Sequence, residues 1–120
     1  MPRQQKSYHG PVEATVDILS GRWKPLILWA LRKGTLRFGQ IEKELSVITP
    51  NITQRMLTRQ LRELEDDGLV VRKVYPEVPP RVEYTLTEKY MSLMPIVEQM
   101  YAWGKDNMGD QIEYEWDGKE

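Results

Sequence analysis

The sequence predicts a mainly α-helical domain with one small β-hairpin, an α+β class of fold. Apolar residues recur at helical spacing in several segments between residues 11 and 108. In contrast, residues 69–87 contain two β-branched, partly alternating stretches separated by prolines, which is typical of a hairpin. The length of 120 residues is that of one domain with a modest core.

The first half of the chain is expected to begin with short helices. Residues 11–19 and 22–33 each carry a proline in the first turn, where the missing N–H is tolerated, and each segment is followed by a glycine. Residues 35–38 read as a brief extended piece, and residues 38–45 as a short amphipathic helix. Residues 46–51 are then a connection.

A further helix is predicted from Thr53 to about Gly68. Thr53 is expected to be its N-cap, because Ile52 and Leu57 flank it as a hydrophobic staple. On a helical wheel of about 100° per residue, three leucines fall within about 60° of one another and predict a core stripe. These leucines are Leu57, Leu61 and Leu64.

The hairpin is predicted next. Residues 69–75 and 82–87 are its two strands, and residues 76–81 form a stiff tip, because proline cannot donate to the strand ladder. Thr87 is expected to cap a long helix over residues 88–108.

The order of these elements predicts the architecture. Two helices joined by a turn and followed by a hairpin are the order of a winged helix-turn-helix, here with an extra helix before and another after. Pro95 should kink the last helix. The chain is expected to divide into a flexible N-terminus at 1–10, one domain at 11–108 and an acidic C-terminal tail at 109–120.

The composition excludes several classes of function. With no cysteine and a single histidine, His9, the chain has no means for thiol chemistry, disulfides or a His- or thiolate-based metal cluster. It has no glycine-rich phosphate loop or convincing carboxylate pair, so we expect no catalysis, cofactor or bound metal. No apolar run reaches the roughly 18 residues of a membrane span, and residues 1–10 lack a signal-peptide core. A cytoplasmic location without membrane association is expected.

The charge of the chain is unevenly distributed. The formal net charge is -1, yet residues 21–90 contain thirteen basic and nine acidic side chains, whereas residues 91–120 contain two basic and seven acidic ones. A basic middle is a hint of an anionic partner.

Three arginines on the predicted helix after Thr53 lie opposite its leucines and form what we call the arginine row: Arg55, Arg59 and Arg62. Basic residues in the first turns oppose the helix dipole at roughly 0.3–1 kcal/mol each, and Arg55 and Arg59 repel each other at i,i+4 spacing. Pairing of Arg59 with Glu63 and of Arg62 with Asp66 would give partial relief. A helix arranged only for its own stability would reverse these charges, so the row indicates an external polyanion rather than a merely solvated face.

We predict that this polyanion is duplex DNA, because a helix entering the major groove leads with its N-terminal residues. Arginine binds guanine O6 and N7 bidentately, and glutamine binds adenine N6 and N7. In the hairpin, an arginine after the paired prolines suits a phosphate or minor-groove contact, although an incidental arginine on a rigid turn is equally consistent. The predicted DNA-binding residues are Thr53, Gln54, Arg55, Thr58, Arg59, Arg62, Arg72, Lys73 and Arg81.

The last predicted helix favours a homodimer, and a helix internal to the core is the alternative. Its apolar residues cover about half of its circumference, more than one small domain needs to shield. They include Tyr90, Leu93, Ile96, Val97, Met100, Tyr101 and Trp103. A two-fold dimer would place the DNA-reading helices about 34 Å apart and predicts an inverted-repeat operator with half-sites one turn apart.

Several segments together resemble one family. GRWKPLILWAL, LRFGQIEKEL, ITQRMLTRQLRELEDDGLV and RKVYPEVPPRVEYTLT, with a late Trp-Gly, are similar to the HxlR-type regulators, small dimeric winged-helix transcription factors of bacteria and archaea. The resemblance spans residues 10–106 and implies a recognition helix starting near Thr53, a wing around Pro79-Pro80 and subunit pairing through the first and last helices. The expected dimer interface is Val12, Val16, Leu93, Ile96, Val97, Met100, Tyr101 and Trp103.

Three features depart from the family pattern. Gly10 stands where many members have a redox-sensing cysteine, which excludes thiol or electrophile sensing by that route. The connection at residues 46–51 is longer than usual, which would lengthen a helix by a turn or shift the approach angle to DNA. Tyr90 replaces a common glycine and is expected to add bulk at the subunit interface.

A winged-helix protein-interaction module without direct DNA reading is the alternative function. No small-molecule effector is identified, because the aromatic residues suit either a small apolar pocket at the dimer interface or ordinary core packing. These residues are Trp23, Trp29, Tyr101 and Trp103.

Overall fold

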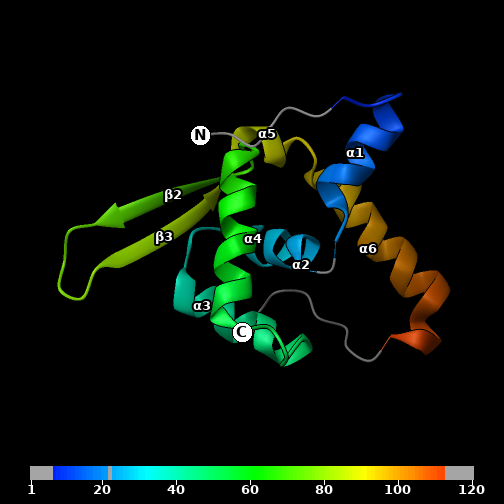
Figure 1. The fold of residues 1–120 in the computed structure, drawn as a ribbon. Helices are drawn as coiled ribbons and strands as arrows, with labels where there is room; N and C mark the ends of the chain where they lie inside the picture. Colours follow the sequence, from blue (N-terminus) through cyan, green and yellow to red (C-terminus); the bar gives the residue numbers. More distant parts are fainter. Residues whose placement is uncertain (1–6, 22, 113–120) are drawn as a thin grey trace.

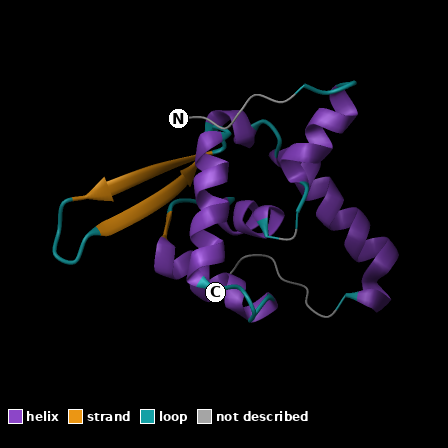
Figure 2. Ribbon diagram, in the orientation of Figure 1, coloured by secondary structure: helices purple, strands orange, loops and turns teal. Residues whose placement is uncertain are grey.

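The structure, a computed structural model, describes residues 7–21 and 23–112 and shows a helical body from which a hairpin projects (Figure 1). The helices are α1 (Pro11–Leu19), α2 (Lys24–Leu31), α3 (Phe38–Ile48), α4 (Gln54–Asp66), α5 (Glu88–Met91) and α6 (Met94–Met108), with a 3-10 turn at Gly109–Gln111. The strands are β1 (Leu36–Arg37), β2 (Val70–Tyr75) and β3 (Arg81–Leu86), and Figure 2 separates them from the helices by colour. Predictions for residues 1–6, 22 and 113–120 lie outside the described residues.

The predicted helices before the hairpin are confirmed, with adjusted ends. α1 has the predicted bounds, and α2 begins at Lys24 and ends at Leu31, inside its predicted range. α3 continues to Ile48 instead of ending at residue 45, so the first part of the long connection is helical. The extra residues therefore lengthen the helix before the turn, which is one of the two outcomes expected for them.

The sheet has one strand more than predicted. β1, within the stretch predicted as extended, pairs antiparallel with β3 through Leu36 opposite Tyr84 and Arg37 opposite Glu83. The strand order is β1-β3-β2. A two-residue strand leaves no periodic signal in the sequence, and its partner is far along the chain, so local patterns could not reveal this pairing.

The prediction of one long helix over residues 88–108 is wrong. Thr87 does cap a helix, and its Oγ1 accepts a hydrogen bond from the Tyr90 backbone N–H at 3.4 Å. However, this helix, α5, ends at Met91, and α6 starts at Met94 with Pro95 in its first turn. Proline lacks an N–H and its ring clashes with the carbonyl four residues earlier, so the expected kink is a complete break.

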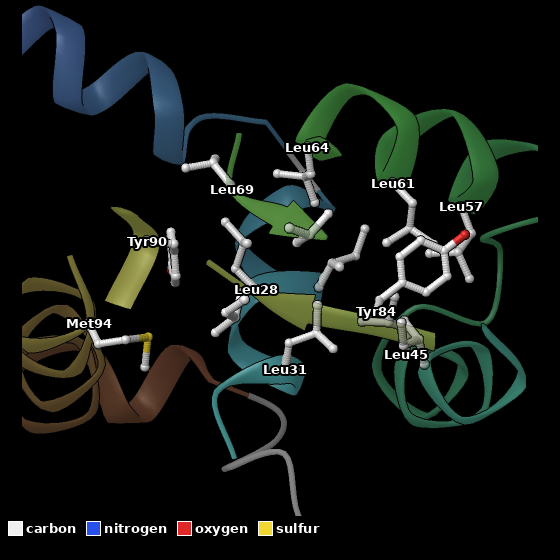
Figure 3. Packing of buried hydrophobic residues seen from close by; sticks show 14 residues of the cluster. Leu28, Leu31, Leu45, Leu57, Leu61, Leu64, Leu69, Tyr84, Tyr90 and Met94 are labelled. Carbon is white, nitrogen blue, oxygen red and sulfur yellow. The ribbon is translucent and has the colours of Figure 1, made fainter. Parts of the chain in front are cut away.

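The core is one cluster shared by α2, α3, α4, the sheet and the start of α6 (Figure 3). The predicted leucine stripe is confirmed, since Leu57, Leu61 and Leu64 are buried and face this cluster. Tyr90 is also completely buried in the core of its own chain, so the expectation that it adds bulk at a subunit interface is wrong. The phenol side chain belongs to the packing that holds α5 against the body.

Local interactions at both ends set the position of α4. Thr53 is the N-cap as predicted, because its Oγ1 accepts a hydrogen bond from the Met56 backbone N–H at 3.1 Å. At the other end Gly68 takes a left-handed φ of 78°. This turn lets the Leu69 N–H bond to the Leu64 carbonyl at 2.9 Å, which closes the helix in a Schellman motif and leads directly into the sheet.

Candidate nucleic-acid interface

The arginine row is exposed along α4, on the opposite side of the helix from the buried leucines. Within residues 7–21 and 23–112, no ion pair joins Arg55, Arg59 or Arg62 to a carboxylate. Three guanidinium groups on one helix face therefore keep their full hydrogen-bonding capacity for a ligand outside the chain.

The predicted pairing within α4 is wrong. Glu63 pairs with Lys24 of α2, with 2.8 Å between its Oε1 and the lysine Nζ, and not with Arg59. The Lys24 side chain is 14% exposed and that of Glu63 is 32% exposed, so the pair is partly shielded from water. α2 thus engages the carboxylate that was expected to pair with Arg59. The sequence gives only a weak signal for this ion pair, because Lys24 and Glu63 lie on different elements.

The polar residues at the start of α4 have structural contacts. The hydroxyl oxygen of Thr53 serves as the cap, as described above. The Gln54 amide Nε2 donates to Glu42 Oε1 of α3 at 3.4 Å, a long bond in an exposed position. Thr58 is half-buried on the side of α4 that faces the sheet. Arg55 and Arg59 are exposed, and neither forms a hydrogen bond or an ion pair within the described residues.

The hairpin presents its predicted residues on two opposite faces. Arg72 lies opposite Tyr84 in the ladder, on the face that also carries buried Val70 and that looks toward α4. Lys73 lies opposite Glu83 on the other face, because successive side chains of a strand alternate. The structure therefore brings Arg72, but not Lys73, next to the arginine row. Strand periodicity could have placed the two on opposite faces, but apolar residues occur on both faces of β2, so the sequence does not show which face lies toward α4.

Arg81 is engaged within the hairpin. Its guanidinium carbon lies 3.9 Å from the ring centre of Tyr75, and it forms ion pairs with Glu77 at 3.2 Å and Glu83 at 3.7 Å. The Nζ of Lys73 lies 4.9 Å from the same ring. These contacts join the two strands near the tip, so Arg81 stiffens the hairpin where a free side chain was expected.

The residues predicted for a subunit interface fall into two groups. Leu93 and Val97 pack against the core, and Tyr101 stacks on Trp29 of the same chain with ring centres 4.9 Å apart. The other group remains exposed and forms what we call the α1/α6 face: Val12, Val16, Ile96, Met100 and Trp103. α1 and α6 lie on the side of the body away from the hairpin (Figure 1).

An apolar groove of about 440 Å³ runs between α1 and α6. It is lined by Pro11, Val12, Thr15, Val16, Leu19, Ser20, Ile96 and Met100. None of the nine residues of α1 is buried. A helix with exposed valines beside an apolar groove is typical of an interaction surface.

The part of the chain that the structure describes contains no helix with the length and apolar character to cross a bilayer.

Comparison with known proteins agrees with this geometry. Residues 18–112 match the family model described as HxlR-like helix-turn-helix. An uncharacterized HTH-type transcriptional regulator of Methanothermobacter thermautotrophicus is 55% identical over 94 residues, covering 78% of this chain and 69% of that protein. The HTH-type transcriptional regulator YybR of Bacillus subtilis is 52% identical over 97 residues, covering 81% and 74%.

Solved structures give the same result. The redox regulator HypR in its reduced form superposes with a TM-score of 0.75 at 50% identity, covering 88% of this chain and all of that one. The reduced form of the transcriptional regulator YodB from B. subtilis superposes with a TM-score of 0.67 at 38% identity, covering 83% and 95%. These proteins are regulators and not enzymes. The chain belongs to the HxlR-like helix-turn-helix family of DNA-binding transcriptional regulators.

Proposed function

We propose that the protein regulates transcription as a homodimer that binds an inverted-repeat operator, with α4 of each subunit in the major groove of one half-site. The observation that carries this proposal is the arginine row, which is exposed and has no carboxylate partner among the described residues. A duplex supplies both the phosphates and the guanine edges that such a row can bind.

The direction of charge along α4 fits insertion by its N-terminal end. Arg55 and Arg59 lie in the first two turns, whereas Glu65, Asp66 and Asp67 follow at the other end. A recognition helix contacts bases with its first turns, and its last turn leaves the groove. Arg55 and Arg59 therefore face the base edges, and the acids lie where the helix leaves the groove.

A second copy of the chain is the proposed occupant of the α1/α6 face. The exposed apolar residues on both helices and the groove between them offer a surface that one small domain does not shield. A two-fold interface pairs the same patch on both subunits, as an inverted repeat in DNA requires. The two recognition helices would then meet successive major-groove faces about 34 Å apart.

Selection of bound sequences from random duplex DNA tests the proposed function as a whole. The expected result is an inverted repeat whose half-site centres are about 10 base pairs apart. Enrichment of one unrepeated site would refute the two-fold arrangement. No enrichment by a folded protein would refute base reading by α4 and favour a winged-helix module that binds other proteins.

Substitution of the arginine row tests the recognition helix. Arg55→Ala and Arg59→Ala should each weaken binding to the selected duplex by about 1–3 kcal/mol and relax the base preference at one position. Lys89→Ala is the control, because it removes one exposed positive charge on α5, near the C-terminal end of α4. Unchanged affinity of both arginine variants in a gel-shift titration would exclude α4 as the recognition helix.

A pair of matched valines tests the dimer. Val16 on α1 is 57% exposed and Val47 on α3 is 56% exposed, but only Val16 belongs to the α1/α6 face. Val16→Asp should convert the dimer into a monomer in sedimentation equilibrium, because it places a charge in an apolar interface. Val47→Asp should leave the dimer intact. A dimer that persists in both variants would exclude α1 from the interface.

A further inference from the structure

A polar crevice of about 350 Å³ lies between α4 and the inner face of the hairpin. It is lined by Phe38, Thr58, Arg62, Glu65, Arg72, Val82 and Tyr84. The crevice brings together one arginine from the recognition helix and one from the wing, which no motif in the sequence connects.

The position of Arg72 in this crevice is unusual for a strand residue. One face of the hairpin carries Val70, Arg72 and Val74 of β2 together with their cross-strand partners Leu86, Tyr84 and Val82 of β3. The end of this face nearest the body packs on the core. An arginine on that face points toward α4 and meets the side where Arg62 emerges. Two guanidinium groups that line one small crevice repel each other, which costs stability unless an anion lies between them.

Among the described residues, one carboxylate, that of Glu65, lines the crevice, but it pairs with neither arginine. Neither Arg62 nor Arg72 forms an ion pair or a hydrogen bond there, and Glu65, which lines the crevice, lies within 4 Å of no basic nitrogen. In contrast, Arg81 on the outer face of the same hairpin has two carboxylate partners. With two arginines and one carboxylate in its lining, the crevice therefore keeps one net positive charge.

We propose that this crevice is a phosphate-binding site in which Arg62 and Arg72 together hold one phosphodiester group of the DNA backbone. The proposal rests on the proposed function and divides the arginine row into two roles. Arg55 and Arg59 read bases, whereas Arg62 sets the depth and direction of α4 by binding the backbone beside the groove.

The geometry of α4 supports this division. Arg62 follows Arg55 by two turns, which is roughly 10 Å along the helix axis at 1.5 Å per residue. A helix that leads with its first turn leaves the groove over that distance, so the later arginine meets the sugar–phosphate wall. Arg72 approaches the same wall from the wing, and the Thr58 hydroxyl offers a further donor to a phosphate oxygen.

The surroundings favour a phosphodiester over a free phosphate. Phe38, Val82 and Tyr84 form an apolar wall, which strengthens charge-assisted hydrogen bonds by excluding water. Glu65 adds one negative charge to the lining. Two guanidinium groups and one carboxylate balance a singly charged phosphodiester, whereas a phosphate monoester carries about -1.5 to -2 charges at pH 7.

The salt dependence of DNA binding tests the shared phosphate. Arg62→Ala, Arg72→Ala and the double variant are titrated with the selected duplex and with a random duplex of equal length over a series of salt concentrations. Each single variant should lower the affinity for both duplexes by the same factor. It should also reduce the slope of log K against log salt by about 0.9. The double variant should lose little more, because both arginines bind one phosphate. Lys89→Ala is the control and should keep the wild-type slope.

Other results would contradict either the sharing of one phosphate by the two arginines or the assignment of the crevice to DNA. A slope loss of about 1.8 in the double variant would mean two separate phosphates. A loss confined to the selected duplex would make Arg62 or Arg72 a base reader. A saturable rise of the melting temperature with millimolar inorganic phosphate at constant ionic strength, together with unchanged DNA slopes, would assign the crevice to a free anion. If Arg55→Ala and Arg59→Ala also leave DNA binding unchanged, the proposed role of α4 as the recognition helix itself fails.

Discussion

Alkaline titration of the buried Tyr90 gives the sharpest test of the packing. Its side chain is completely buried among core residues that include Leu28, Leu69 and Met94 (Figure 3). Its hydroxyl group has no hydrogen-bond partner among the described residues. Burial disfavours the charged phenolate and raises the pKa of Tyr90 from 10.0 to about 12. The perturbation is therefore a rise of pH through this range.

The sign and size of the effect follow from proton linkage. Between pH 10 and 12 the unfolded chain releases the Tyr90 proton, whereas the folded chain keeps it, so the free energy of unfolding falls as the pH rises. The contribution is fully present below pH 10. Keeping the proton up to a pKa of about 12 instead of 10.0 corresponds to roughly 3 kcal/mol, a large part of the roughly 5–15 kcal/mol that stabilises a typical domain.

Urea denaturation of the wild type and Tyr90→Phe at several pH values from 8 to 12 measures this effect. Other titrating groups contribute equally to both proteins, so only the difference between the two matters. We expect the wild type to lose roughly 3 kcal/mol more than Tyr90→Phe over the upper part of the range. Parallel curves would refute the argument, because they would show that the phenol ionises as readily in the folded chain as in the unfolded one.

Three further predictions concern the support of α4. Thr53→Ala removes the N-cap and should lower the free energy of unfolding by about 1 kcal/mol, seen as a lower melting temperature; an unchanged value would contradict the cap. Leu61→Ala opens a cavity in the core and should cost about 2–5 kcal/mol in urea denaturation, whereas a cost typical of surface sites would disprove its burial. A double-mutant cycle with Lys24→Ala and Glu63→Ala should give a coupling of about 1 kcal/mol, and additive effects would show that the pair contributes nothing.

Helix α4 could be predicted from the sequence because all of its signals are local. A capping threonine, leucines at helical spacing and a terminal glycine lie within one short stretch, and the structure uses each of them as expected. The wing strands follow equally from β-branched residues and prolines. Exposure of the arginine row could also be predicted, because the row lies on the side of the helix opposite the buried leucine stripe.

The remaining features depend on contacts between distant segments. The pairing of β1 with β3 and the bridge from Lys24 to Glu63 join elements whose proximity only the fold creates. The break before Pro95 was predicted only as a kink, because the sequence does not reveal whether neighbouring contacts bridge a missing hydrogen bond. The same holds for the crevice between α4 and the hairpin, which Arg62 and Arg72 line from separate elements.

The alternation of side chains in β2 limits how the wing can change in length. One residue inserted between Val71 and Arg72 would turn Arg72 to the outer face and remove it from the crevice, whereas two inserted residues would restore its direction. An insertion at residues 76–80 lies beyond the paired residues of β2 and would leave both faces of the strand as they are. Homologous wings are therefore expected to vary freely in length at the tip, and in β2 only by even numbers of residues.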